Sequence, residues 1–175
     1  MSLAFPDVHD SRLDTADPVA VLAPRHYQDV AMSAYEDAEL LLTAILPDAR
    51  IEHVGASAIP GAYSRGGVDV CVAVPREGFD EAMGVLSEAG YVPNAHWAGD
   101  DRRAALAAPH AGVALTLQLI ESGSGHEALM RFRDALRADA QLLARYNAVR
   151  IAAAPQGAAA YGGAKAGFIA DVLRA

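Results

Sequence analysis

The sequence predicts an α/β (α+β) domain, in which a small mixed β-sheet is flanked by helices and followed by a helical C-terminal tail. Three observations indicate this class. Apolar residues recur at helical spacing over residues 24–46, which predicts an amphipathic helix. Short apolar segments between residues 49 and 120 are typical of strands, and alanine-rich helical patterns fill much of residues 127–173.

The length and composition are those of one folded domain. The chain has 175 residues, of which 53% are hydrophobic and 21% are charged. A chain of this kind buries a core and is not disordered. Residues 1–17 lack periodicity, so we expect a flexible N-terminal arm followed by a single domain over residues 18–175.

Proline and glycine bound the first helix and the first strand. Pro24 suits the first turn of the helix, and Pro47 ends it. Residues 49–54 then predict a strand that stops at Gly55.

The second strand is predicted over residues 68–74, which are apolar except for Asp69 and Cys71. These two positions are i and i+2 on the strand, so their side chains project from the same face of the sheet. A carboxylate in so apolar a strand must be hydrogen-bonded, charge-paired or bound to a metal ion, because burying it alone is costly.

The rest of the chain alternates helices and strands before its helical tail. Helices are predicted over residues 79–89, 127–137, 140–153 and 161–173. Strands are predicted over residues 102–108, where the pattern is ambiguous, and over residues 113–120. In the last of these strands Thr116 and Gln118 share one face, and leucines occupy the other.

The charge of the chain argues against a nucleic-acid partner. The formal net charge is −8, and the arginines are scattered among aspartates and glutamates. A non-specific nucleic-acid binder shows a basic stripe, because phosphate contacts supply most of its affinity. We therefore expect a small-molecule or nucleotide ligand and no nucleic acid.

The sequence also indicates a compartment. Its single cysteine allows no intrachain disulfide, which fits a reducing environment. Its start lacks the pattern of a signal peptide, and no apolar run approaches the ~18 residues that cross a bilayer. We expect a cytoplasmic protein without a membrane partner, and no feature of the sequence points to a particular oligomeric state.

Several motifs, in one order, resemble those of the GrpB family. The run EHVGASAIPG over residues 52–61, followed by Arg65 and by Asp69 within VDV, resembles the family signature EHVGST-[SA]-VPG followed by KPIIDI. Later matches are ESGS at residues 121–124, FRDALR at 132–137, RYNAVR at 145–150, and Tyr161 with Ala164, Lys165, Phe168 and Ile169. The resemblance covers the chain from about residue 21 to residue 173.

This resemblance implies a nucleotidyltransferase-like fold, with a Gly-Ser turn after the first strand and an Asp-x-Asp-like motif on the next. It implies a bacterial transferase that acts on or activates a small anionic or nucleotide-containing substrate in a cleft around Asp69 and Arg65. The alternative is a non-catalytic protein that binds a nucleotide or a small metabolite on the same fold.

In nucleotidyl transfer, carboxylates hold Mg²⁺, which neutralises phosphate charge and activates the attacking oxygen. Mg²⁺ is therefore the expected cofactor, with Asp69 as its ligand, and the sequence shows no flavin, haem or zinc pattern. Cys71 stands where the second carboxylate is expected and is a soft ligand, so we expect a degenerate metal site.

The chain departs from the family pattern at other positions with a chemical role. Ala56 replaces the serine of the turn, while Ser57 keeps a hydroxyl at the threonine position. Thr116 and Gln118 stand where the family has a His-x-His, and they could orient an unusual substrate without a metal. Arg65 keeps the positive charge of the family's lysine.

The candidate site residues fall into two groups. The predicted catalytic residues are Asp69, Gln118 and His53, and Asp69 is also the candidate metal ligand. The predicted substrate- and phosphate-binding residues are Gly55, Ser57, Arg65, Thr116 and Lys165.

Most candidates also have a structural interpretation, which the sequence leaves open. Asp69 and Arg65 could pair with each other, and Ser57 could cap the turn. His53 and Cys71 could be core residues, as single buried histidines and cysteines often are. Further alternatives concern Glu52, which could be structural, Lys165, which could lie on a solvated face, and the loop residues His96, Trp97 and His110, whose roles stay open.

Overall fold

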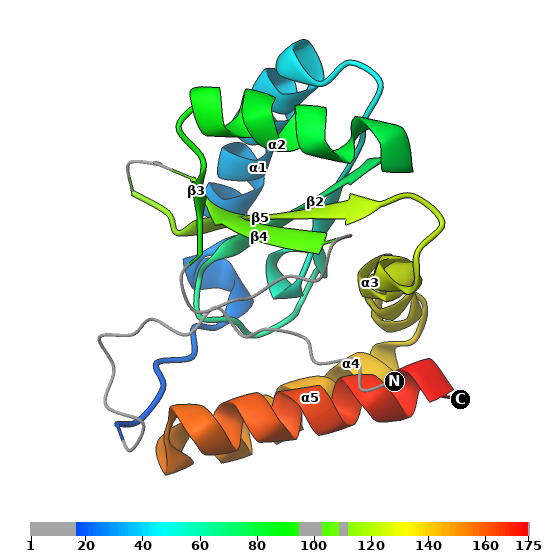
Figure 1. Ribbon diagram of the computed structural model, residues 1–175. Coiled ribbons are helices and arrows are strands. Elements are labelled where there is room, and N and C mark those ends of the chain that lie inside the picture. The colour runs from blue at the N-terminus through cyan, green and yellow to red at the C-terminus, as the bar shows by residue number, and fades with distance from the viewer. Residues whose placement is uncertain (1–16, 95–102, 109–111, 175) are drawn as a thin grey trace.

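The computed structural model describes residues 17–94, 103–108 and 112–174 (Figure 1). Its described strands form one five-stranded sheet with the order β1-β2-β5-β4-β3. Only β2 and β5 run parallel, and the other neighbours are antiparallel. The strands are β1 (Arg50–Val54), β2 (Val68–Val74), β3 (Val92–Pro93), β4 (Arg103–Ala107) and β5 (Leu115–Glu121).

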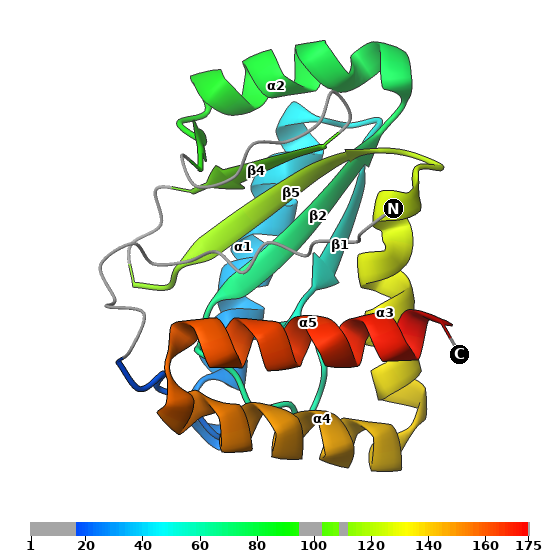
Figure 2. The ribbon, with the colours of Figure 1, turned by 60° about the horizontal axis from the view of Figure 1, so that its bottom comes forward.

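Helices cover the sheet on both sides and at one end. Two of them, α1 (Gln28–Ile45) and α2 (Phe79–Glu88), pack on one face. On the other face, α3 (Ala128–Ala138) covers the part of the sheet near β1. Figure 2 shows α4 (Ala140–Ala153) and α5 (Ala158–Arg174) lying side by side beneath the end of β1.

The larger core forms because the core-facing side chains of β2 and β5 lie at alternate positions that pair with each other across the two strands. Valines at even positions of β2 and leucines at odd positions of β5 point toward α1 and α2, where Leu42 and Leu86 are fully buried. The strand residues of this core are Val68, Val70, Val72, Val74, Leu115, Leu117 and Leu119. This arrangement leaves the odd positions of β2 and the even positions of β5 on the opposite face.

A second core joins the chain after β1 to the C-terminal helices. Ile59 is fully buried there against Phe132 of α3, Tyr146 of α4 and Ile169 of α5. The rings of Phe132 and Tyr146 meet edge to face with centroids 5.3 Å apart, a favourable arrangement for aromatic pairs. The helical tail therefore supports the turn that follows β1.

The predicted elements are confirmed, with small changes at their ends. The ambiguous segment at residues 102–108 forms β4, and α5 begins at Ala158 rather than at residue 161. The earlier start follows from Gly157, which has a positive φ of 95° and separates α5 from the preceding turn. None of the described helices is long and apolar enough to cross a membrane. The predicted arm, residues 1–17, lies almost wholly outside the described residues.

The first prediction concerns α1. Replacing Leu42 by alanine should lower the free energy of unfolding by about 2–5 kcal/mol, because its fully buried side chain would leave a cavity between α1 and the sheet. Leu40, two residues away and 76% exposed, is the matched control, and its replacement should change stability by no more than ~0.5 kcal/mol. Urea unfolding measures both, and equal losses would contradict this placement of α1.

Candidate functional site

The face of the sheet opposite α1 carries Asp69, and we call it the Asp69 face. Strand register defines it: Asp69 lies between Val54 of β1 and Thr116 of β5. Cys71 lies in the next row, between Glu52 and Gln118. The strands therefore bring Asp69, Thr116 and Gln118 together on one surface, as expected for a common site.

Gly55 ends β1 and lies directly against Asp69. Its backbone has φ 72° and ψ −169°, a region that is essentially open to glycine alone. A Cβ atom on Gly55 would lie 2.2 Å from Oδ2 of Asp69. The carboxylate thus packs against the backbone of the turn, which explains why the turn needs glycine here.

Side chains from three helical segments hold the turn by its carbonyl groups. An irregular segment has few backbone partners, so buried carbonyls must find side-chain donors. Four of these donors lie 2.6–3.0 Å from their carbonyl oxygens. The donors, with the residues whose carbonyls accept, are Arg137 with Ala58, Gln28 with Ile59, Asn147 with Gly61, Tyr27 with Ala62, and Arg150 with Tyr63. We call these five donors the clamp residues.

Arg150 is the most deeply buried cation of the clamp, at 3% exposure. Besides the Tyr63 carbonyl, it donates to the hydroxyl of Tyr161. Its guanidinium lies 5.0 Å from the ring centroid of Tyr146 and 5.4 Å from that of Tyr161, so two aromatic faces also stabilise its charge.

Arg133 ties α3 to β1. Its Nη1 donates to Oε2 of Glu52 at 2.6 Å and to the carbonyl of His53 at 2.8 Å. Arg50 donates to the other oxygen of Glu52. Burial alone would raise the pKa of Glu52, but its bonds to Arg133 and Arg50 outweigh burial and lower it. Glu52 is therefore a charged partner in an ion-pair network.

His53 lies on the face of the sheet opposite Asp69, because it pairs with Val70. Its ring stacks on Tyr35 of α1 with centroids 4.4 Å apart. Its Nε2 is 2.9 Å from Oγ of Ser57, so the hydroxyl predicted to bind phosphate is engaged by His53. The structure thus separates His53 from Asp69.

The thiol of Cys71 is fully buried among apolar groups that include Val54, Ile120 and Met130. Burial, assisted by the charge of Glu52, raises the pKa of Cys71 to about 12. The thiol is neutral at physiological pH and cannot take the place of the second carboxylate.

The two predicted cationic ligands lie on segments that flank the turn. Arg65 is half-buried in the loop between the turn and β2. Lys165 is half-buried on α5, midway between Tyr161 and Ile169, which face the core at i−4 and i+4. Lys165 therefore lies on the inward stripe of α5, and its charge acts on the Tyr161 hydroxyl.

His96, Trp97 and His110 fall outside the described residues. Within residues 17–94, 103–108 and 112–174, no group of three or more His, Cys, Asp or Glu side chains is arranged to hold a metal ion. On the Asp69 face, the carboxylate of Asp69 and the hydroxyl of Thr116 are adjacent oxygen groups that offer themselves to a cation.

The clamp and Arg133 were missed as functional supports by sequence reasoning. The sequence could have indicated them through FRDALR and RYNAVR, where arginines stand beside apolar residues that are buried in the second core. Arg133 and Arg137 are one helical turn apart, beside Phe132 and Leu136 of the second core. An arginine in such a position must find acceptors, and β1 provides them for Arg133 and the turn after β1 for Arg137.

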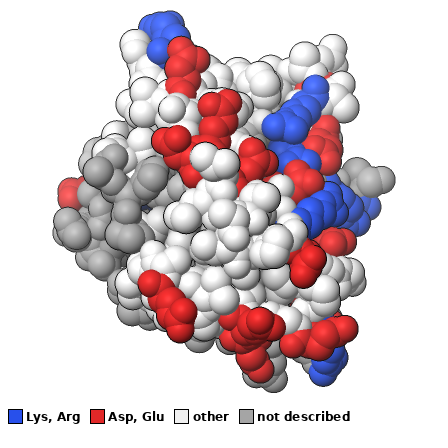
Figure 3. Space-filling view, turned by 90° about the horizontal axis from the view of Figure 1, so that it is seen from above, with Lys and Arg blue, Asp and Glu red and all other residues white. Residues whose placement is uncertain are grey.

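Charges of both signs are interleaved on the surface seen from above in Figure 3, where most basic side chains gather toward one side among acidic ones.

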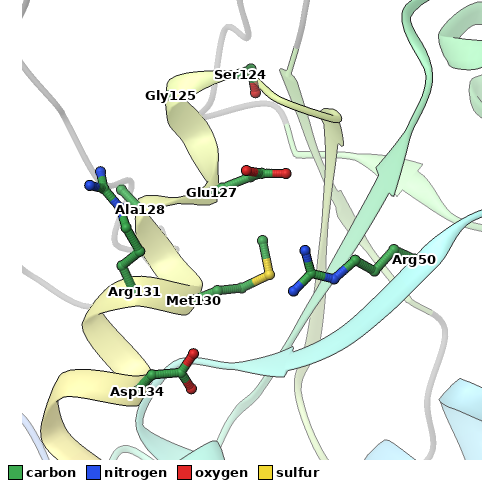
Figure 4. Close-up of a pocket in the computed structure, with 8 residues that line it drawn as sticks. All are labelled: Arg50, Ser124, Gly125, Glu127, Ala128, Met130, Arg131 and Asp134. Atoms are coloured by element: carbon green, nitrogen blue, oxygen red, sulfur yellow. The ribbon is translucent and has the colours of Figure 1, made fainter.

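A cavity of about 400 Å³ opens between the start of β1 and α3 (Figure 4). Arg50, Met130 and Asp134 are among its lining residues. Arg50 pairs with Ala73, four residues along β2 from Asp69, so this cavity is separate from the Asp69 site.

The contact between Gly55 and Asp69 yields a second prediction. Replacing Gly55 by alanine should destabilise the protein by at least ~2 kcal/mol, through the forbidden backbone region and the clash with the carboxylate. Gly163→Ala, in the open middle of α5, should be neutral or stabilising. Chemical denaturation measures both. In an Asp69→Ala background the cost at Gly55 should shrink, and an unchanged cost would refute the contact.

A third prediction concerns pH. Burial, together with the charges of Arg137 and Arg133, lowers the pKa of His53 to about 4. His53 therefore binds a proton near pH 6.5 in the unfolded chain but only near pH 4 in the folded chain. As the pH falls from 6.5 to 4, proton binding favours the unfolded chain and the free energy of unfolding decreases. Between pH 7 and pH 5, His53 should account for roughly 2 kcal/mol of lost stability.

Urea unfolding of the wild type and of His53→Gln at both pH values isolates this contribution. The variant should lose less stability on acidification by about that amount. Parallel losses in the two proteins would mean that His53 is not held neutral.

Comparisons with known proteins identify the family and the fold of the chain. The family model described as "GrpB protein" matches residues 24–175. A UPF0157 protein of Vibrio cholerae is 32% identical over 154 residues, covering 84% of this chain and 78% of that protein. The crystal structure of the conserved protein GrpB from Enterococcus faecalis has a TM-score of 0.70 at 19% identity, over 89% of this chain and 98% of that one.

More distant structures show the fold alone. Cid1, described as having RNA terminal uridylyl transferase activity, has a TM-score of 0.50 at 15% identity, over 71% of this chain and 38% of Cid1. A cytoplasmic RNA terminal U-transferase has a TM-score of 0.51 at 15% identity, over 77% of this chain and 40% of that chain. This chain spans about two fifths of those transferases. It belongs to the GrpB family and has a nucleotidyltransferase-like fold.

Proposed function

We propose that this GrpB-family chain acts on or activates a small anionic or nucleotide-containing substrate at the Asp69 face. The observation that carries the proposal is the contact of the Asp69 carboxylate with the Gly55 turn. It places an ionisable acceptor at the meeting point of a glycine turn and two central strands. A carboxylate in such a place serves a donor group of a ligand or a cation that a phosphate brings with it.

Electrostatics divides the roles among the residues. Asp69 repels a bare phosphate, so the phosphate needs positive charge of its own, and half-buried Arg65 and Lys165 are the candidate ligands. Thr116 and Gln118 extend the face beyond Asp69 with neutral polar groups. In this assignment Asp69 holds a cation or the reacting donor, and the two basic residues hold the anion.

The residues fit one Mg²⁺ ion rather than a site with two carboxylates. Asp69 and Thr116 offer hard oxygen atoms on one face, and Mg²⁺ is commonly held by one or two carboxylates with substrate phosphates and water. The neutral thiol of Cys71 adds nothing to such a site. When bound, Mg²⁺ would neutralise phosphate charge and activate the attacking oxygen.

A second candidate function is binding without turnover. It is favoured by the state of the two ionisable groups in the row next to Asp69. Cys71 is buried and neutral, and Glu52 is committed to Arg133 and Arg50. In this case the same face binds the nucleotide or a small metabolite and releases it unchanged.

A fourth prediction tests the shared part of both functions. Mg²⁺ or Mn²⁺ with at least one of the four nucleoside triphosphates should raise the melting temperature of the protein. At a ligand concentration 100 times its Kd, binding adds about 2.7 kcal/mol, or ~5–10 °C for a chain of this length. Asp69→Asn should abolish the shift, whereas Asp171→Asn, on the exposed surface of α5, should preserve it.

Absence of a shift with all four triphosphates and both metals would sink the proposal. If a shift occurs, pyrophosphate release in the presence of an extract of small metabolites separates the two functions. Release that depends on Asp69 supports transfer, and binding without release supports the second candidate.

A further inference from the structure

Gln118 is a buried residue whose amide oxygen has no hydrogen-bond partner among the described residues. It lies in β5, one of the two central parallel strands, and is 5% exposed. Its Oε1 is fully buried and has no hydrogen-bond partner in the part of the chain that the structure describes. A buried acceptor without a partner costs free energy, and in a native protein it calls for an explanation.

The described neighbours of Gln118 do not bond to its Oε1. In its own row Gln118 lies between Cys71 of β2, whose thiol is a weak donor, and Ala105 of β4, whose side chain has no donor. In one adjacent row Thr116 lies between Asp69 and Ala107. In the other adjacent row Ile120 lies opposite Arg103.

Another glutamine shows what a structural role looks like in this protein. Gln28 donates from Nε2 to the Ile59 carbonyl at 2.7 Å and accepts at Oε1 from the Gly61 N–H at 3.3 Å. Both ends of its amide hold the turn. Gln118 is more deeply buried, yet its Oε1 has no partner among the described residues, so the described contacts do not explain why this position carries an acceptor.

We infer that Gln118 forms a specificity subsite that receives a neutral N–H or O–H donor of the ligand. The unpartnered Oε1 is a hydrogen-bond acceptor, so it receives an N–H or O–H group and gives nothing to the oxygen atoms of a phosphate. The subsite takes the base or sugar of a nucleotide, while its phosphates lie toward Asp69 and the basic residues. This inference rests on the proposed function and specifies its substrate class as nucleoside-type ligands rather than bare polyphosphates.

Calorimetric titration with two kinds of probe tests the subsite. The probes are the four nucleoside triphosphates and inorganic tripolyphosphate, each with Mg²⁺. The wild type should bind at least one nucleotide more tightly than tripolyphosphate. Gln118→Met, which keeps the shape and removes the amide, should weaken that nucleotide by about tenfold and leave tripolyphosphate unchanged.

The same variant has a distinctive expected stability. Without ligand, Gln118→Met should melt at the same temperature as the wild type or higher, because it removes a buried acceptor that has no partner. Gln28→Met, which loses two hydrogen bonds to the turn, should melt ~2–4 °C lower. Gln141→Met, at an exposed position on α4, should change neither melting nor binding.

The outcomes separate the two proposals. A melting temperature of Gln118→Met as low as that of Gln28→Met would overturn the inference in favour of a structural role. Unchanged nucleotide binding in Gln118→Met would overturn it as well. If the wild type binds tripolyphosphate as tightly as every nucleotide, the anion site stands and the inference alone fails. If the wild type binds neither probe, the proposed function fails and the inference falls with it.

Discussion

The structure depends on how the turn after β1 satisfies its carbonyl groups. An irregular buried segment must find donors outside itself, and here they come from α1 and its N-terminal cap, from α3 and from α4. These helices are far apart in sequence, so the turn can take its shape only when the whole chain has folded. The position of Gly55 against Asp69 is therefore a property of the complete domain, and the helical tail is part of the site although it contributes few candidate ligands.

Much of the fold was predictable, because hydrophobic periodicity reports which side of an element is buried. The alternation of core-facing side chains in β2 and β5 predicted that Asp69 and Thr116 both lie on the face away from that core. The strand register, which the structure supplies, makes them neighbours. Sequence reasoning could not separate His53 from Asp69, because the face of a short strand depends on its register with the next. It also missed Arg133 and the clamp, because their acceptors are backbone carbonyls, which no residue type reveals.

The surroundings of Asp69 keep the glycine turn of the family pattern and differ from it in the neighbouring strand. Cys71, which stands where the pattern has a second carboxylate, is an apolar core residue in behaviour. Around Asp69 itself, the neighbouring polar groups of β5 are the neutral hydroxyl of Thr116 and the neutral amide of Gln118. In the proposed site, these groups would discriminate between ligands by hydrogen bonding rather than by charge.

Arg133 has an effect beyond its ion pair with Glu52. In the described sheet β1 has a strand neighbour on one side only, and the free edge of a sheet can pair with a strand from another molecule. By binding the His53 carbonyl, Arg133 occupies an acceptor that an incoming strand would need. The residue that anchors α3 thereby also leaves one acceptor fewer for strand pairing at this edge of the sheet.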